Sequence, residues 1–256
     1  MTQQRNPKLA VITGGSRGLG KSMALHLATH GIDSVITYRS SEKEAHEVVS
    51  EIVARGQKSA ALRLEAGDSA SFAAFAATLE ATLGRVWQRS TFDFLVNNAG
   101  IGLHLPFAQT SEANFDELMN VHLKGPFFLT QKLLPLIADG GRILNVSSGL
   151  ARFTFPGNAA YATMKGGIEV LTRYLAKELG SRKISVNTIA PGAIETDFGG
   201  GLVRDNAEVN KLVASETALG RAGLPDDVGS AVAMLLSPES GWINGQRIEV
   251  SGGMRL

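Results

Sequence analysis

Short, nearly continuous apolar runs alternate along the chain with longer amphipathic segments. Apolar runs bounded by glycines and polar turns are typical of strands covered on both faces. They predict strands at residues 9–13, 34–38, 59–64, 92–96, 142–146, 185–189 and 247–250. The amphipathic segments predict helices at residues 19–29, 42–54, 69–82, 112–137, 159–179 and 225–235. This alternation indicates an α/β fold, in which helices cover both faces of a parallel sheet.

Two stretches interrupt the pattern. Gly125 and Pro126 lie inside the predicted helix 112–137, where proline removes a backbone donor and is expected to kink or divide the helix. Three consecutive glycines at 199–201 cannot hold a rigid element, and we expect them to hinge a lid at 198–210. No internal repeat or interdomain linker is found, so the sequence predicts one domain over residues 1–256.

Composition and charge argue against several classes of function. The chain has 25 Lys and Arg against 24 Asp and Glu, a net charge of +1 that favours neither nucleic acid nor membranes as partners. It has no Cys, and its five His show no metal-ligand spacing, so we expect no disulfide and no metal. Because no segment has the length of a signal-peptide core or a membrane span, a cytoplasmic location is expected.

A glycine-rich turn opens the first predicted helix directly after the first strand. Small residues there allow a pyrophosphate to approach the backbone, and the helix start offers free N–H groups. The candidate cofactor-binding residues of this turn are Gly14, Ser16, Arg17, Gly18, Leu19 and Gly20. A nucleoside triphosphate is disfavoured, because the turn lacks the Lys-Ser/Thr pair of a P-loop.

The end of the second strand indicates which dinucleotide binds. Arg39 and Ser40 stand there, with no acidic residue before Glu42 to bind a ribose 2′-hydroxyl. Arg39 together with Arg17 predicts a guanidinium clamp on a 2′-phosphate, and hence NADP(H). The alternative is that both arginines are ordinary solvated surface residues.

Tyr161 and Lys165 stand four residues apart in a predicted helix, so they share one face, and Ser148 precedes them. A tyrosine has an ordinary pKa near 10, and a neighbouring cation favours its phenolate. The pair therefore predicts a proton-transfer site. By itself this spacing is weak evidence for a catalytic site, and the motifs around it decide whether it marks one.

That context is a series of motifs in a fixed order. It runs from the glycine turn through Asn97-Asn98-Ala99-Gly100, Asn120, Ser148 and Tyr161-x-x-x-Lys165 to Pro191-Gly192. In these motifs the chain resembles the short-chain dehydrogenase/reductase family over nearly its whole length, especially members similar to 3-oxoacyl-carrier-protein reductases. The resemblance implies a Rossmann-type, doubly wound, seven-stranded parallel sheet. It also implies hydride transfer at nicotinamide C4 and a homotetramer or homodimer.

The resemblance also implies catalytic roles. Tyr161 would be the general acid of reduction, and Ser148 would hydrogen-bond the substrate oxygen. Lys165 would lower the pKa of Tyr161 and hold the nicotinamide ribose, while Asn120 would anchor a water of a proton relay. Around the cofactor the family pattern implies contacts from Asn98, Ala99, Gly100, Pro191, Gly192, Ile194 and Thr196.

One cofactor contact departs from the family pattern. After the third strand the family commonly has an Asp that contacts adenine, whereas this chain has Glu65 followed by Ala66. We expect Glu65 and Ala66 to line the adenine site, unless Asp68 substitutes for the missing Asp.

The substrate pocket is expected beyond these motifs. Its candidate residues are mostly apolar or aromatic, which suits a hydrophobic ketone or acyl chain: Ile101, His104, Leu150, Phe153, Phe155 and Phe198. Arg152 either meets an anionic substrate group or is a surface residue, and the second reading is preferred.

The sequence therefore predicts an NADPH-dependent enzyme that reversibly reduces a ketone or 3-oxoacyl carbonyl, a small-molecule substrate. An NAD-linked secondary-alcohol or sugar dehydrogenase is the alternative on the same scaffold. A non-catalytic NADP(H)-binding regulator is the alternative from another class, although a regulator has no need of the Ser148, Tyr161 and Lys165 set.

Overall fold

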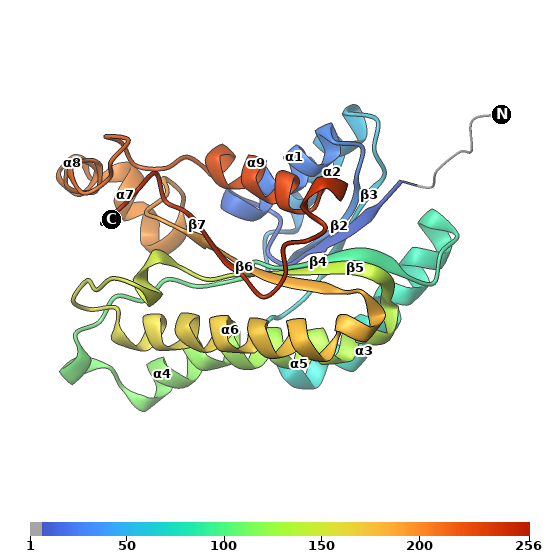
Figure 1. Cartoon of the computed structure of the whole chain (residues 1–256), viewed down its shortest axis with the longest axis horizontal. Coiled ribbons are helices and arrows are strands. Elements are labelled where there is room, and N and C mark those ends of the chain that lie inside the picture. The colour runs from blue at the N-terminus through green and yellow to red at the C-terminus, as the bar shows by residue number, and fades with distance from the viewer. Residues whose placement is uncertain (1–6) are drawn as a thin grey trace.

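The computed structural model describes residues 7–256, which form a parallel sheet with helices on both faces (Figure 1). The seven strands lie in the order β3-β2-β1-β4-β5-β6-β7. Their bounds are β1 (Leu9–Ile12), β2 (Asp33–Tyr38), β3 (Ser59–Arg63), β4 (Phe92–Asn97), β5 (Ile137–Val146), β6 (Ser185–Pro191) and β7 (Arg247–Val250). In the sheet centre, Val11 pairs with Val35 on one side and Leu95 on the other. The predicted Rossmann-type sheet is confirmed.

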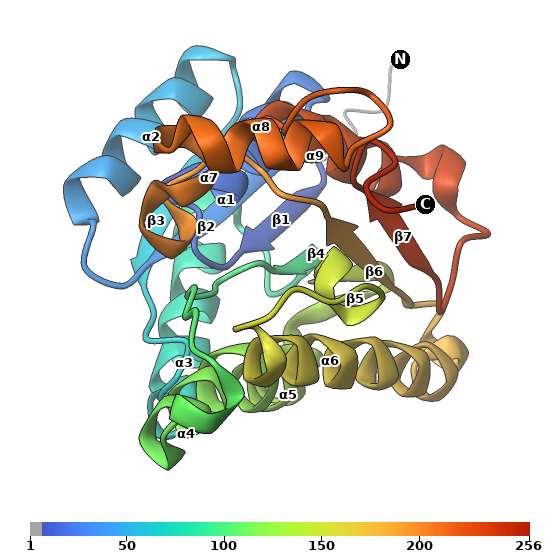
Figure 2. The ribbon, with the colours of Figure 1, turned by 90° about the vertical axis from the view of Figure 1, so that its left-hand side faces the viewer.

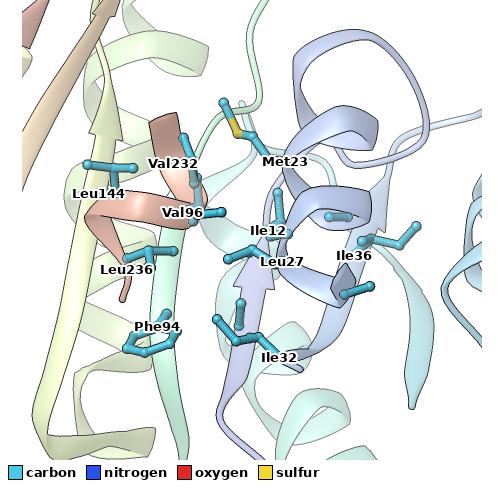
Figure 3. Close-up of a cluster of buried hydrophobic side chains, with 14 of the residues drawn as sticks. Ile12, Met23, Leu27, Ile32, Ile36, Phe94, Val96, Leu144, Val232 and Leu236 are labelled. Carbon is cyan, nitrogen blue, oxygen red and sulfur yellow. The ribbon is translucent and has the colours of Figure 1, made fainter. Parts of the chain in front are cut away.

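Two layers of helices bury the two faces of the sheet (Figures 1 and 2). One layer holds α1 (Gly18–Thr29), α2 (Glu42–Ala54) and α9 (Pro225–Leu235). Figure 3 shows part of its core, where Met23 and Leu27 of α1 and Val232 of α9 pack over Ile12 and Val96. The other layer holds α3 (Phe72–Thr82), α4 (Glu112–Met119), α5 (Gly125–Leu133) and α6 (Ala159–Glu178).

The predicted helix 112–137 is divided and ends earlier than expected. Asn120–Lys124 is a π-helical turn between α4 and α5, closed by a hydrogen bond from the Gly125 N–H to the Asn120 carbonyl. Pro126 follows, so the division falls where glycine and proline predicted a break. The helix ends at Leu133 because Pro135 cannot continue it, and β5 begins at Ile137 rather than at residue 142.

The segment after β6 contains more helix than the sequence indicated. Gly199, Gly200 and Gly201 all have positive φ angles, from 62° to 78°. They form a short turn that leads into α7 (Leu202–Asp205) and α8 (Ala207–Ser215), two helices absent from the sequence prediction. Left-handed backbone at three successive positions explains the glycines.

The 83–90 region before β4 is fixed by one aromatic side chain. Trp87 is buried, and its indole N–H donates to the Asp33 carboxylate at 2.8 Å. This contact lies at the amino ends of the strands. The carboxyl ends of the strands lie at the opposite edge of the sheet. The strand order reverses between β1 and β4, and in doubly wound sheets a ligand crevice forms at the carboxyl edge beside such a switch point.

Candidate active site

The glycine turn between β1 and α1 is shaped for a close ligand approach. Gly14 and Gly18 have positive φ angles of 67° and 53°. A Cβ on Gly20 would lie 2.2 Å from the Gly14 carbonyl oxygen, so only glycine fits there. The first turn of α1 has no side-chain cap and no acidic residue, which leaves its N–H groups and positive dipole end for an anion. These features fit the pyrophosphate of a dinucleotide.

Asn98 braces this turn from the end of β4. Its side-chain amide donates to the carbonyls of Thr13 and Gly14 at 2.8 and 3.1 Å. The Thr13 hydroxyl in turn accepts from the N–H groups of Asn98 and Ala99, both at 2.9 Å. Asn98 thus has a scaffolding contact that the sequence did not reveal, because its partners are backbone atoms 84 and 85 positions away.

The structure brings Arg39 beside Glu65, at the edge where an adenosine would lie. The guanidinium and carboxylate are 3.6 Å apart, and both side chains are substantially exposed. Asp68 is used differently, because its carboxylate accepts from the Ala70 N–H and caps a short 3₁₀ turn. Of the two acids considered for the adenine site, Glu65 is therefore the one near Arg39, whereas Asp68 serves the backbone. Arg17 and Ser40 are exposed at the same edge.

The segment after β6 closes the other side of the crevice. Gly192 continues the pairing with β7 by donating to the Val250 carbonyl at 3.1 Å. Ile194 bridges to Gly223, and Thr196 reaches the glycine turn, within 3.7 Å of a Cβ placed on Gly18. Residues 191–196 and the phosphate turn thus meet at the same crevice. That residues 191, 192, 194 and 196 contact the cofactor stays a prediction.

Ser148, Tyr161 and Lys165 converge at the carboxyl ends of β5 and β6. Tyr161 and Lys165 lie one turn apart on α6 and are almost completely buried, with the ammonium 5.5 Å from the centre of the phenol ring. The ammonium donates to the Val146 carbonyl at 2.7 Å. Ser148 begins the next 3₁₀ turn, where its hydroxyl accepts from the Leu150 N–H.

Burial controls the proton affinities of this pair. It raises the pKa of Tyr161 above its ordinary value, and the Ser148 hydroxyl opposes that rise. Burial also lowers the pKa of Lys165 to about 7, because the charged form loses its hydration. In the protein without its ligands, desolvation thus holds the pKa of Tyr161 above its ordinary value. That Lys165 lowers this pKa in the complete active site stays a prediction.

A charged network that the sequence did not reveal holds the Ser148 segment in place. The Glu169 carboxylate accepts from the Ser147 hydroxyl at 2.7 Å and from the Arg247 guanidinium at 2.6 Å. Arg247 also donates to the Ser148 carbonyl at 3.2 Å. A residue of the last strand thereby positions the backbone of a candidate catalytic residue 99 positions earlier.

Asn120 and His122 share the π-helical turn but face different groups. The Cβ of Asn120 lies 3.9 Å from a Cβ placed on Gly67, beside the loop that follows β3. His122, which the sequence analysis did not single out, is buried with its ring edge-on to Tyr161 at 5.0 Å.

A cavity of about 480 Å³ opens beside the amino end of α6. It is lined by three of the predicted pocket residues, His104, Leu150 and Phe155, and by Pro106, Phe107, Thr154, Pro156, Gly157, Asn158, Ala159 and Ala162. This lining is mostly apolar, which suits a hydrophobic ligand.

The other predicted pocket residues lie elsewhere. Phe198 packs against Tyr161 with ring centres 5.9 Å apart, and Ile101 belongs to the small apolar cluster around Tyr161. Phe153 lies behind Gly149, where a Cβ would come within 2.6 Å of its ring. Arg152 pairs with Glu249 at 2.9 Å and donates to the carbonyls of residues 254 and 255, so it clamps the C-terminal segment.

Metal-ligand clusters and membrane-spanning helices are both absent from residues 7–256. This part of the chain contains no group of three or more His, Asp or Glu residues that could hold a metal ion. None of its helices is both long and apolar enough to cross a membrane.

A phosphate-binding turn at the switch point, beside a buried Tyr–Lys pair with a serine, defines a dinucleotide-dependent oxidoreductase. The chain belongs to the short-chain dehydrogenase/reductase family. The matching family model is described as enoyl-(acyl carrier protein) reductase and covers residues 14–255.

Curated relatives match almost end to end. The hydroxynaphthalene reductase-like protein Arp2 of Metarhizium brunneum is 35% identical, over 96% of this chain and 94% of that protein. The 3-oxoacyl-[acyl-carrier-protein] reductase FabG of Staphylococcus aureus is 36% identical, over 97% of this chain and 98% of that protein.

Solved structures agree closely with this fold. The reductase LugOII, described as promiscuous and as catalysing keto-reduction at C1 in lugdunomycin biosynthesis, superposes with a TM-score of 0.93. It is 36% identical, and the match covers 99% of this chain and all of that one. The angucycline C-6 ketoreductase LanV with bound NADP has a TM-score of 0.92 and 33% identity, over 97% of this chain and 95% of that one.

Proposed function

We propose that this enzyme is an NADPH-dependent ketoreductase that converts a hydrophobic ketone or 3-oxoacyl carbonyl reversibly to a secondary alcohol. One observation carries the proposal: Ser148, Tyr161 and Lys165 converge at the sheet edge that also holds the phosphate-binding turn. A regulator that only senses the cofactor would have no use for a buried phenol paired with a buried amine.

The chemistry follows from the atoms that these residues present. The cofactor, when bound, supplies the hydride that reaches the carbonyl carbon. Negative charge then develops on the carbonyl oxygen, and the Ser148 hydroxyl stabilises it by donating a hydrogen bond. The Tyr161 O–H bond breaks as its proton passes to that oxygen, which leaves an alcohol and a phenolate. A positioned acid of this kind typically contributes about 10²–10⁴-fold to the rate.

Burial suits Tyr161 to the direction of reduction. Because desolvation raises its pKa, the phenol stays protonated and ready to donate at neutral pH. A charged Lys165 next to it stabilises the phenolate that remains after the proton has left. Reduction therefore begins from the protonation states that this site already favours.

NADPH rather than NADH is proposed because Arg39 and Arg17 lie exposed at the edge expected to receive the adenosine 2′-phosphate. The relative LanV, which binds NADP, supports the same preference. An NAD-linked secondary-alcohol or sugar dehydrogenase is the alternative, and Glu65 beside Arg39 is the feature that favours it.

The substrate class is proposed from the cavity and the relatives. The apolar, partly aromatic lining of the 480 Å³ cavity favours a hydrophobic carbonyl compound over a densely hydroxylated sugar. The relatives are named as a hydroxynaphthalene reductase-like protein, a 3-oxoacyl-[acyl-carrier-protein] reductase and an angucycline C-6 ketoreductase, and the last two names denote reduction of a keto group.

A substrate panel tests the proposal. NADPH oxidation would be measured with fused aromatic ketones, cyclic ketones and acetoacetyl thioesters, with an enoyl thioester included because of the name of the family model. The proposal predicts turnover of at least one carbonyl class and none of the enoyl thioester. Turnover of the enoyl thioester alone, or of sugars with NAD, would contradict it.

A further inference from the structure

The loop between β5 and α6, residues 149–158, lines much of the substrate cavity. Thr154 and Phe155 are among its lining residues, and the loop is irregular beyond the 3₁₀ turn Gly149–Ala151. An irregular loop keeps one conformation only when contacts from other segments fix it. The end of the chain supplies such contacts, because the C-terminal segment 251–256 runs from β7 past the end of α8 (Figure 2).

Arg255 of this C-terminal segment contacts the cavity loop in two ways. Its guanidinium carbon lies 3.9 Å from the centre of the Phe155 ring, which is a stacked cation–π contact. Its Nη1 donates to the Thr154 carbonyl at 2.8 Å. One side chain thus holds both the backbone of the loop and the aromatic ring next to it. Because Phe155 lines the cavity, the position of Arg255 fixes part of the cavity wall.

The same arginine also holds the end of α8. Its Nε donates to the Glu216 carboxylate at 2.7 Å, and its backbone N–H donates to the Glu216 carbonyl at 3.0 Å. The neighbouring Met254 is buried and pairs with Thr217 in an antiparallel bridge. Arg255 therefore joins the cavity loop to α8, whose first residues belong to the lid predicted at 198–210.

The backbone of Arg255 is held in a strained conformation. Its φ angle is 50°, in the left-handed region that residues with a side chain rarely adopt. Arg152 of the cavity loop donates to the Arg255 carbonyl at 2.9 Å and to the Met254 carbonyl at 2.8 Å. Strain of this kind persists only where the surrounding contacts fix the residue, and it is concentrated at functional sites. The end of the chain therefore has a defined position against the cavity loop.

We propose that Arg255 is a positioning residue for the substrate, because it holds the Phe155 ring as a wall of the cavity. The inference rests on the proposed function and deepens it by naming the substrates that benefit. A fused-ring aromatic ketone is large enough for its second ring to pack against Phe155, so its binding should depend on Arg255. A small cyclic ketone occupies the reaction centre without reaching that wall, so its binding should not.

Steady-state kinetics with tetralone, a fused-ring ketone, and cyclohexanone, a small one, test the proposal. For Arg255→Ala we expect the KM for tetralone to rise at least about fivefold, while kcat, the KM for NADPH and the KM for cyclohexanone change less than about twofold. Arg255→Lys should show most of the same loss. A lysine keeps the charge beside Glu216, but it cannot lie flat on the Phe155 ring and donate to Thr154 at the same time.

A double-variant cycle separates positioning from a general loss of structure. Phe155→Ala removes the ring through which Arg255 acts, so adding Arg255→Ala to it should raise the KM for tetralone less than about twofold further. Arg182→Ala is the matched control and should leave every KM unchanged. Arg182 also pairs with a carboxylate, that of Asp139, and donates to a backbone carbonyl, but it lies where β5 and β6 begin. Additive effects, an equal loss with cyclohexanone, or a wild-type KM for tetralone in Arg255→Lys would overturn the proposal.

Amide hydrogen exchange tests the link between the cavity loop and α8 without any substrate. In Arg255→Ala, peptides that cover residues 149–158 and 207–219 should both exchange at least about threefold faster than in the wild type, whereas peptides from β1 and β4 should not change. Unchanged exchange in either segment would contradict the proposal. If the proposed ketone reduction itself fails, the wild type turns over neither ketone, and the exchange result still shows whether Arg255 holds the two segments.

Discussion

At the scale of single residues, burial gives Lys165 and Tyr161 their chemical character. The pKa values of the two side chains shift in opposite directions, because that of the phenol is raised and that of the amine is lowered to about 7. Both shifts have the same cause, the loss of hydration of the charged form. In consequence the neutral phenol is stable, whereas the charge of the amine is sensitive to pH near neutrality.

The pH dependence of NADPH capture follows from the Lys165 shift. A group with a lowered pKa is charged below it, so Lys165 loses its charge as the pH rises through about 7. We expect kcat/KM for NADPH, which reports ionisations of the free enzyme, to fall as the pH rises through that value. A flat profile from about pH 6 to 9 would contradict this prediction.

Arg39 and Glu65 are expected to tune cofactor choice in opposite directions. Arg39→Ala should lower kcat/KM for NADPH by about 10–100-fold, because a charge-assisted hydrogen bond contributes roughly 1.5–3 kcal/mol, and should leave NADH little changed. Glu65→Gln removes the carboxylate 3.6 Å from Arg39 and should raise the NADPH preference. Steady-state kinetics of the wild type and the variants with NADPH and NADH test this prediction. Equal kcat/KM values for the two cofactors, unchanged by Arg39→Ala, would contradict the proposed preference for NADP(H).

At the scale of elements, a buried polar network fastens α6, and with it Tyr161 and Lys165, to the sheet. Asn145 of β5 accepts from Asn97 of β4 at 2.8 Å and donates to Thr172 of α6 at 2.9 Å. Thr188 of β6 donates to the same Thr172 hydroxyl at 2.7 Å. Polar residues inside continuous apolar strands thus fix the helix against the sheet.

Removing the centre of that network should destabilise the fold. Asn145→Ala removes one hydrogen bond from the Asn97 amide, which keeps Thr130, and one from the Thr172 hydroxyl, which keeps Thr188. Because two buried hydrogen bonds are lost, we expect the free energy of unfolding to fall by about 1–3 kcal/mol in urea denaturation. Ser50→Ala, an exposed helix position, is the control and should stay within about 0.5 kcal/mol of the wild type. If the two variants lose the same stability, the network does not fasten α6 to the sheet.

The limits of sequence-based prediction also appear at the scale of elements. Apolar runs placed the seven strands, because strands covered on both faces need such runs. The periodicity of apolar residues could not reveal the π-helical turn that contains His122, because the one extra residue in such a turn leaves the apolar pattern of the helix almost unchanged. The contacts of Asn98, Arg152 and Arg247 were equally hidden, because their partners are backbone atoms or charges far away in the sequence.

The candidate site was more predictable than its surroundings. The glycine turn, Tyr161 and Lys165 could be located because their spacing is local and their chemistry restricts the residue type. The predicted pocket residues proved harder to place. Some line the cavity, some lie at the reaction centre and some only pack against other side chains, because loop conformation decides which way Phe153 and Phe155 face.

At the scale of the whole molecule, the layer that carries α6 presents apolar side chains to solvent. Phe127 and Phe128 on α5 are 43% and 41% exposed, and Val170 and Tyr174 on α6 are 45% and 65% exposed. Helices α5 and α6 lie side by side below the sheet in Figure 1. Exposed apolar groups on neighbouring helices are typical of an interface. We therefore propose the homodimer or homotetramer that the family resemblance implied.

Light scattering after gel filtration tests this assembly. The wild-type protein should behave as a dimer or tetramer, and the double variant Phe128→Asp, Tyr174→Asp should be smaller, because two buried carboxylates would oppose association. Val53→Asp on α2, whose side chain is 54% exposed in the other layer, is the matched control and should keep the wild-type size. A monomeric wild-type protein would contradict the proposal.

The central claim is that Tyr161 protonates a carbonyl oxygen during NADPH-dependent reduction, and Tyr161→Phe tests it most directly. The exchange removes one buried oxygen and keeps the ring that packs between His122 and Phe198. NADPH oxidation by an accepted ketone should fall by at least about 10²-fold, while NADPH binding, measured by fluorescence titration, should change less than about threefold. Full reductase activity in Tyr161→Phe would contradict the mechanism.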